Sequence, residues 1–286
     1  MTLLSTYETQ VADLLHDPNH VQWSVFQLDN YINEARRQTV MDTGCLRSLQ
    51  ESFCTINVEQ YTFGQVTGAN ILNAGSGYTA PTVSFTGGGG GSGVAATLEV
   101  TNGAVTSITF TSFGSGYTSA PTAVITDSTG INASIQVGII NVYTYDVLNI
   151  NIVWGAYRYP LQWRSWSNFS AQLRGYTTLQ RQPVMWSTYG DASLFLGPLP
   201  DQTYPMEIDS IILPTPMTDY VTNDPIPAMS QDPIKFYAAY LAKFYDQSYG
   251  EAQTFLDQYQ RRVREVTAAY TRRIPDIYQN IVNTKG

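Results

Sequence analysis

Histidine is scarce in this chain, which limits the acid–base and metal chemistry that its side chains can support. The two histidines, His16 and His20, are four residues apart, the spacing of a zinc-binding pair on one face of a helix. Pro18 lies between them and would interrupt such a helix, so we expect no metal site. Both lie near the N-terminus, and we expect no Ser-His or Cys-His nucleophile. Cys45 and Cys54 lack a Cys-x-x-Cys spacing and are predicted to be buried thiols.

Two further patterns are typical of ligand-binding or catalytic sites, but each also has an ordinary structural explanation. Residues 88–93 match the phosphate-binding pattern Gly-x-Gly-x-x-Gly, yet residues 94–100 alternate like a strand instead of opening a helix, and no lysine accompanies them. Glu207 and Asp209 would share one side of a strand, either as the carboxylate pair of a hydrolase or as an ordinary solvated strand face. We therefore expect no catalytic residue, no cofactor and no enzymatic activity.

The charges of the chain are segregated along its length. The net charge is -8, residues 48–157 contain no Lys or Arg, and residues 235–286 contain eight basic against five acidic residues. A protein that grips DNA presents a basic stripe, whereas an acidic surface repels the duplex. We therefore expect DNA to pass this protein without tight binding.

Length and composition favour a folded chain of about two domains. It has 286 residues, 43% hydrophobic and 13% charged, which argues against disorder. No run of 18 apolar residues occurs, and residues 1–15 mix polar and apolar positions. We expect no membrane span and no secretory signal, and synthesis in the cytosol.

Helical patterns are predicted at both ends of the chain. Apolar residues recur at helical spacing between residues 3 and 15, and Ser24 with Gln27 forms a capping-box pattern for a second helix that ends near Gly44. After a proline-rich loop, residues 233–273 are predicted to form two long helices, separated near Gly250.

An internal repeat marks a stretch of different composition. Residues 75–82, GSGYTAPT, return as residues 114–122, GSGYTSAPT, and each copy leads into a short strand. Asn102-Gly103 is a type I′ hairpin signal between two alternating strands. The pattern predicts a small all-β subdomain built from two related halves.

The repeat region reads as an insertion, because Tyr-rich, strand-like sequence lies on both sides of it. We expect residues 67–137 to form the insert and residues 1–66 with 138–286 to form the core. The predicted fold class is α+β: a helical bundle of two N-terminal helices plus long C-terminal helices, with a central β region and the inserted small all-β subdomain.

Four segments, in this order, carry a resemblance to a known family. They are residues 31–37 (YINEARR), residues 194–209 with a Pro-rich turn before an alternating strand, residues 224–227 (DPIP), and residues 233–240 at the start of a long helix. In order and local pattern the chain resembles a head-to-tail adaptor (connector or head completion protein) of a tailed bacteriophage, over about 200 residues outside the insert. The GSGYT repeat is separately similar to a β module found in phage structural proteins.

The resemblance implies a virion structural protein in the phage neck, between capsid and tail, made in the bacterial host cytoplasm. It implies a homo-oligomeric ring, expected to be a dodecamer, that binds the portal protein, extends the DNA ejection channel and carries tail or nozzle proteins during tail assembly, without a membrane. The residues expected to contact the portal are Arg261, Arg262, Arg264, Arg272, Arg273, Ile274, Tyr278 and Lys285.

A second hypothesis is a receptor- or glycan-binding virion module. Tyr78, Tyr117 and Phe113 would then lie on the surface of the insert, because aromatic rings with polar tips suit sugars and protein partners alike. A virion hydrolase is a third hypothesis and would depend on Glu207 and Asp209.

Overall fold

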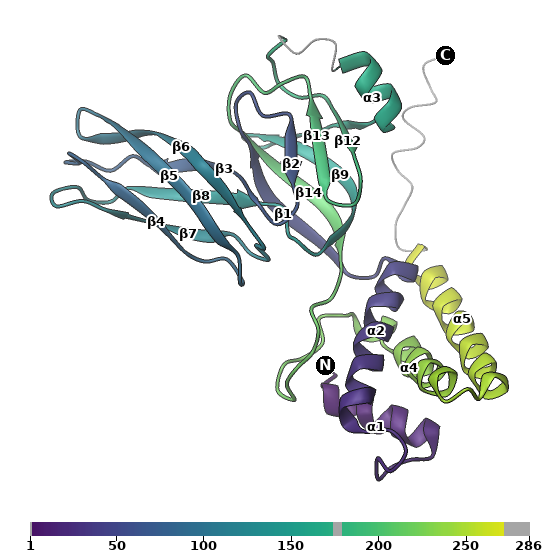
Figure 1. Ribbon diagram of the computed structural model, residues 1–286. Helices are drawn as coiled ribbons and strands as arrows, with labels where there is room; N and C mark the ends of the chain where they lie inside the picture. The colour runs from purple at the N-terminus through teal and green to yellow at the C-terminus, as the bar shows by residue number, and fades with distance from the viewer. Residues whose placement is uncertain (1, 174–178, 272–286) are drawn as a thin grey trace. The chain divides into compact units, whose positions relative to one another are not determined.

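A computed structural model describes residues 2–173 and 179–271 (Figure 1). The chain is mostly β, with 38% in strands and 28% in helices, and the described residues form five α-helices. The expected fold class, a helical bundle with a central β region, is therefore wrong. The helical patterns were read correctly at the two ends, but the strands between them dominate the chain.

The chain divides into two compact units. Residues 1–46 and 213–286 form a helical unit, and residues 47–212 form a β unit. The boundaries expected at 66/67 and 137/138 both fall inside the β unit, so the proposed division between core and insert stays a prediction.

The helical unit is built from both ends of the chain. Its elements are α1 (Leu4–Leu15), α2 (Val25–Thr43), the short 3-10 helix η2 (Ala228–Ser230), α4 (Asp232–Tyr245) and α5 (Tyr249–Thr271). The predicted capping box starts α2, since Gln27 N donates to Ser24 Oγ and Ser24 N donates to Gln27 Oε1, and Gly44 ends it in the left-handed conformation. Small residues of α4, among them Ala238 and Ala242, are fully buried and let the neighbouring helices approach closely.

A buried ion pair joins α2 to the proline-rich loop of the helical unit. Arg36 Nη2 lies 2.9 Å from Asp224 Oδ1, Arg36 Nε lies 3.1 Å from Oδ2, and both side chains are almost fully buried. The Tyr7 hydroxyl donates to the same carboxylate at 2.8 Å. Burial and the neighbouring Asp224 raise the pKa of Tyr7, so its phenol stays protonated. Asn33 completes the network, because its amide bonds both the N–H and the carbonyl of Met217.

The β unit contains two four-stranded sheets and three two-stranded sheets. Its strands are β1 (Arg47–Cys54), β2 (Gln60–Thr62), β3 (Val66–Asn73), β4 (Thr82–Gly87), β5 (Ser92–Thr101), β6 (Ala104–Ser115), β7 (Pro121–Thr126), β8 (Ser134–Ile139), β9 (Thr144–Trp154), β10 (Tyr157–Pro160), β11 (Gln162–Trp163), β12 (Met185–Thr188), β13 (Ser193–Gly197) and β14 (Tyr204–Ile212), and α3 (Trp166–Leu173) lies between β11 and β12.

The two larger sheets share one hydrophobic core. The order β1-β14-β9-β10 defines sheet A, and β11-β12-β13-β2 defines sheet B. Alternate residues of β14, such as Met206 and Ile208, face this core together with Ile150 and Ile152 of β9 and Trp186 of β12. The intervening residues point to the other face of sheet A, which carries charged side chains such as Glu51 and Glu207 beside apolar ones such as Leu49.

The three two-stranded sheets, formed by strands β3 to β8 in Figure 1, enclose a second hydrophobic core. The pairs are β3 with β8, β4 with β7, and β5 with β6, and each pair contacts the other two. Strands β3, β4 and β5 of the first half correspond to β6, β7 and β8 of the second half. If each strand is replaced by its counterpart, the same three strand pairs result. The two sequence repeats therefore form the two related halves that the sequence predicts, arranged with an approximate two-fold relation.

The buried ion pair gives a first testable expectation. Asp224→Ala removes the carboxylate that pairs with Arg36 and leaves the guanidinium buried without a carboxylate partner among the described residues, so the free energy of unfolding should fall by about 3–5 kcal/mol. Chemical denaturation of the full chain measures this, with Asp13→Ala on the exposed side of α1 as the matched control. A loss for Asp224→Ala equal to that of the control would contradict the structural role.

A second expectation concerns two carboxyl groups on adjacent helices. Glu8 of α1 is only 9% exposed, and Glu8 Oε1 and Asp29 Oδ1 of α2 are both buried without a hydrogen-bond donor. Burial, with the Asp29 carboxyl as the next cause, raises the pKa of Glu8 from 4.5 to about 7. The protonated Glu8 thus stabilises the folded chain fully below pH 4.5, and this contribution is lost as the pH rises through 7.

The variant Glu8→Gln keeps a hydrogen-bond donor without the charge. It should be more stable than the natural chain at pH 8–9, by roughly 1–3 kcal/mol, and the advantage should disappear towards pH 4. Denaturation curves across this pH range measure the difference, with the exposed Glu34→Gln as control. A difference that does not change with pH would rule out the raised pKa.

Candidate functional site

The outer face of sheet A carries the charged side chains that the sequence singled out. Glu207 and Asp209 lie on the same side of β14, as the alternation predicts, and neither faces the core. Each is bonded to an arginine from another strand of sheet A: Arg47 of the adjacent β1 pairs with Asp209, and Arg158 of β10, which is separated from β14 by β9, pairs with Glu207. Sequence reasoning missed these partners, because they lie far from β14 along the chain.

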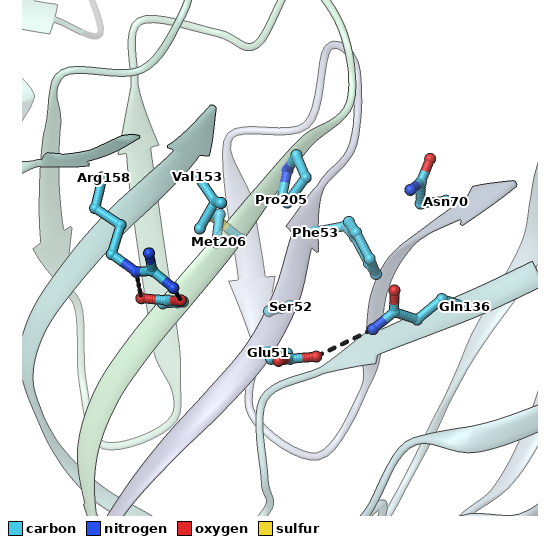
Figure 2. Close-up of a pocket in the computed structure, with 10 residues that line it drawn as sticks. Glu51, Ser52, Phe53, Asn70, Gln136, Val153, Arg158, Pro205 and Met206 are labelled. Carbon is cyan, nitrogen blue, oxygen red and sulfur yellow. Dashed lines mark hydrogen bonds and ion pairs between the residues drawn. The ribbon is translucent and has the colours of Figure 1, made fainter. Parts of the chain in front are cut away.

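A cleft of about 240 Å³ opens on this face, next to the Arg158–Glu207 pair (Figure 2). Glu51 of β1 lies directly opposite Glu207 of β14, and its carboxylate accepts a hydrogen bond of 3.1 Å from the Gln136 amide of β8. Asn70 of β3 lines the same wall, and the apolar residues that line it are Phe53, Val153, Pro205 and Met206. The cleft therefore lies where the repeat region meets sheet A.

The electrostatics of the cleft do not suit general acid catalysis. The hydrogen bond from Arg158 lowers the pKa of Glu207, with Arg158 Nε 2.6 Å from Glu207 Oε2. A general acid requires a carboxyl whose pKa is raised, so that it keeps its proton near neutral pH. Glu207 instead stays ionised, and with Arg158 it forms a neutralised ion pair on a strand face. The hydrolase hypothesis is not supported by this geometry.

Of the three aromatic residues expected on the surface of the insert, Tyr78 and Tyr117 are buried and Phe113 is half-buried. Tyr78 and Tyr117 are 5% and 2% exposed, so neither ring is available to a ligand. Phe113 is half-buried against the core of the repeat region and stacks on Phe110 at 5.6 Å between ring centroids. The expectation that Tyr78 and Tyr117 form a binding surface is therefore wrong, because both rings pack in the interior of the repeat region.

The glycines of the repeat explain why Tyr78 is buried. A Cβ on Gly75 would lie 2.6 Å from the Tyr78 ring, and one on Gly130 would overlap the ring. The ring thus lies in a slot that only glycine leaves open, and its hydroxyl accepts a hydrogen bond of 3.1 Å from Ala133 N. Gly130 belongs to the loop after β7, in the other copy of the repeat.

Tyr117 repeats this arrangement with the copies exchanged. A Cβ on Gly114 would lie 2.8 Å from its ring, and one on Gly91, in the loop after β4, would overlap the ring. Each tyrosine therefore fills a slot whose far wall is the loop of the opposite half. The GSGYT pattern is a packing motif in this structure.

The described arginines of the C-terminal cluster differ in what they contact. Arg261 and Arg262 both pair with Glu265, at 3.3 and 3.1 Å, and Arg262 also reaches Asp232 at 3.2 Å. Arg264 is exposed and donates only to the carbonyl of Gln260 in its own helix, among the contacts of the described residues. The remaining members of the expected portal contact, Arg272, Arg273, Ile274, Tyr278 and Lys285, lie outside the described residues.

The residues rejected as chemical sites occupy structural positions. His16 lies directly after α1 in the left-handed conformation, so it does not share a helical face with His20. The glycine-rich residues 88–91 lead into β5, a strand, as the sequence indicated. Cys45 and Cys54 are free and buried as predicted, and burial raises the pKa of the Cys54 thiol to about 12. Within residues 2–173 and 179–271, no cluster of three or more His, Cys, Asp or Glu is arranged to hold a metal.

The most specific polar arrangement in the helical unit was missed by sequence reasoning. Asn33 and Arg36 belong to the first segment of the family resemblance, and Asp224 and Ile226 belong to the third. The structure brings these segments together: Asp224 accepts from Arg36 and from Ile226 N. The signal was present as an Asn-x-x-Arg spacing on a predicted helix, but nothing in the sequence named its partner 188 residues away.

The chain was compared with known proteins, and neither the protein-family models nor the curated proteins gave a match. None of the described helices is long and apolar enough to cross a membrane.

The glycine slots lead to a third expectation. Gly91→Ala and Gly130→Ala each push a Cβ into a tyrosine ring without requiring a left-handed backbone, so each should lower the free energy of unfolding by about 1–3 kcal/mol. Gly250→Ala, where a Cβ meets nothing within 4 Å, is the matched control and should leave stability unchanged or slightly higher. Thermal unfolding followed by near-ultraviolet circular dichroism measures all three. Equal stability of Gly91→Ala, Gly130→Ala and the control would contradict the slots.

Proposed function

We propose that this chain is a head-to-tail adaptor of a tailed bacteriophage, a structural protein that assembles as a ring under the portal and carries the next tail component. The observation that carries the proposal is the buried network of Arg36, Asn33 and Asp224. It gives a physical reason for two segments of the family resemblance to occur together, because residues 31–37 and 224–227 form one structural unit.

The distribution of charge supports the same function. Residues 48–157 contain no Lys or Arg, and they supply most of the β unit. A surface of this kind does not grip phosphates, which suits a channel wall past which DNA must slide. The proposal includes the localisation that goes with it, in the neck of the virion between capsid and tail.

Arg264 is the described residue that we propose contacts the portal. Arg261 and Arg262 are partly neutralised by Glu265 and Asp232, whereas no carboxylate of the described residues pairs with Arg264. An exposed guanidinium near the end of a long helix is suited to a carboxylate on a partner. The portal surface that receives α5 is therefore proposed to be acidic.

The test is native mass spectrometry of the full chain mixed with the portal ring encoded beside it. We expect the portal to take up a fixed number of copies set by its own symmetry. Arg264→Glu should reduce this uptake at least tenfold, and Arg37→Glu, the same charge change at an exposed position of α2, should reduce it by less than twofold. No uptake of the natural chain would overturn the adaptor function. Equal uptake of the two variants would overturn only the role of Arg264.

A further inference from the structure

One stretch of the β unit has the composition of a protein–protein interface. Residues 147–190 contain no Asp, Glu or Lys. They contain four arginines, Arg158, Arg164, Arg174 and Arg181, of which Arg174 lies outside the described residues, and nine aromatic residues. Protein interfaces are enriched in Tyr, Trp and Arg and depleted in Lys, Asp and Glu. Compared with the rest of this acidic protein, this stretch is rich in aromatic residues and arginine and lacks Asp, Glu and Lys, as expected of a protein interface.

The structure places several of these aromatic side chains at the surface instead of in the core. Trp154, Tyr157, Tyr159 and Trp163 are 51%, 70%, 49% and 59% exposed, and we call these four residues the aromatic edge. They follow one another along β9, β10 and β11. The chain passes from sheet A to sheet B at Leu161, so the aromatic edge runs beside both sheets.

The backbone of this edge is not the feature that would attract a partner. Among the described strands, β10 pairs only with β9, and all four of its residues are exposed. Pro160 has no N–H to offer to an added strand, which is a usual protection of an edge. A partner would therefore be held by the side chains, with large aromatic rings as anchors and arginine beside them.

The arginines beside the aromatic edge add positive charge. Arg164 donates to Gln162 at 3.0 Å, and no carboxylate of the described residues pairs with it. Arg181 is also exposed, and the contact given for it runs through its backbone N–H to Leu199. Arg158 is the exception, since it forms an ion pair with Glu207. A partner surface with carboxylates and without Lys or Arg would complement this edge.

The chain itself provides such a surface. Residues 48–146 carry no Lys or Arg, and Glu51, Glu99 and Asp146 are exposed on them. We propose that the aromatic edge of one copy docks on the acidic surface of residues 48–146 of a second copy. The two surfaces are different patches, so the contact is head-to-tail and repeats around a ring. The inference rests on the ring assembly of the proposed function and assigns the contact that builds it.

Nucleic acid fits the aromatic edge less well. Binding of a single strand combines stacking rings with a groove of cations that follows the phosphates. The β unit contains no lysine, and two of its arginines, Arg47 and Arg158, are already paired with carboxylates. The observations therefore favour a protein surface.

Site-specific photo-cross-linking of the full chain tests the contact. A benzophenone amino acid replaces Tyr157 in one variant and Tyr249, an exposed tyrosine at the start of α5 that belongs to neither proposed surface, in the control. Each variant is irradiated at high concentration, alone, with the portal ring, and with a single-stranded oligonucleotide. We expect position 157 to cross-link to a second copy at least tenfold more than position 249, with the attachment point between residues 48 and 146.

Cross-linking of position 157 to the oligonucleotide, or no cross-link to a second copy in any of the mixtures, would overturn the proposed contact. In addition, Tyr157→Ala with Trp163→Ala should weaken self-association at least tenfold, while Tyr249→Ala, outside both surfaces, should change it less than twofold. Portal uptake of the natural chain is scored separately. Uptake without a cross-link between copies would leave the adaptor function standing and reject this contact alone.

Discussion

The ion pair between Arg36 and Asp224 is the constraint on which the helical unit depends. A buried charge is tolerated only when a partner neutralises it and its remaining hydrogen-bonding groups are satisfied. Asp224 meets this requirement with bonds from Arg36, Tyr7 and the backbone of Ile226. The arginine comes from a helix before the β unit and the aspartate from a loop after it, so the helical unit cannot be completed until the whole β unit has been made.

Local features of the fold were predictable because they depend on neighbouring residues. The capping box of Ser24 and Gln27, the left-handed Gly44 and the hairpin turn at Asn102-Gly103, where both residues have positive φ, all follow from short-range chemistry. The balance between helix and strand was not predictable in the same way. The helical patterns at the two ends are continuous and were read correctly, but the strands between them depend on long-range pairing, so the predicted fold class gave the helices too much weight.

In the candidate site, too, the features set by neighbouring residues were predictable and the long-range contacts were not. Alternation along β14 placed Glu207 and Asp209 on one face, but their arginine partners follow from strand order, which no local pattern contains. Tyr78 and Tyr117 were misread because an aromatic ring with a polar tip suits a binding surface as well as a core, and no local pattern decides between the two. Their burial depends on glycines in the opposite half of the repeat, more than 25 residues away in each case.

The exchange of tyrosines between the two halves bears on how this module can arise. In this structure the tyrosine of each copy packs against the glycine loop of the other copy. A single copy of the repeat would therefore leave its own tyrosine and its own glycine loop without a packing partner. An ancestor with one copy could satisfy both only by sharing them with a second molecule. Duplication within one chain then turns an obligatory dimer into a monomeric module. We therefore expect such a module to be inherited as a pair of repeats, because neither half can enclose its tyrosine alone.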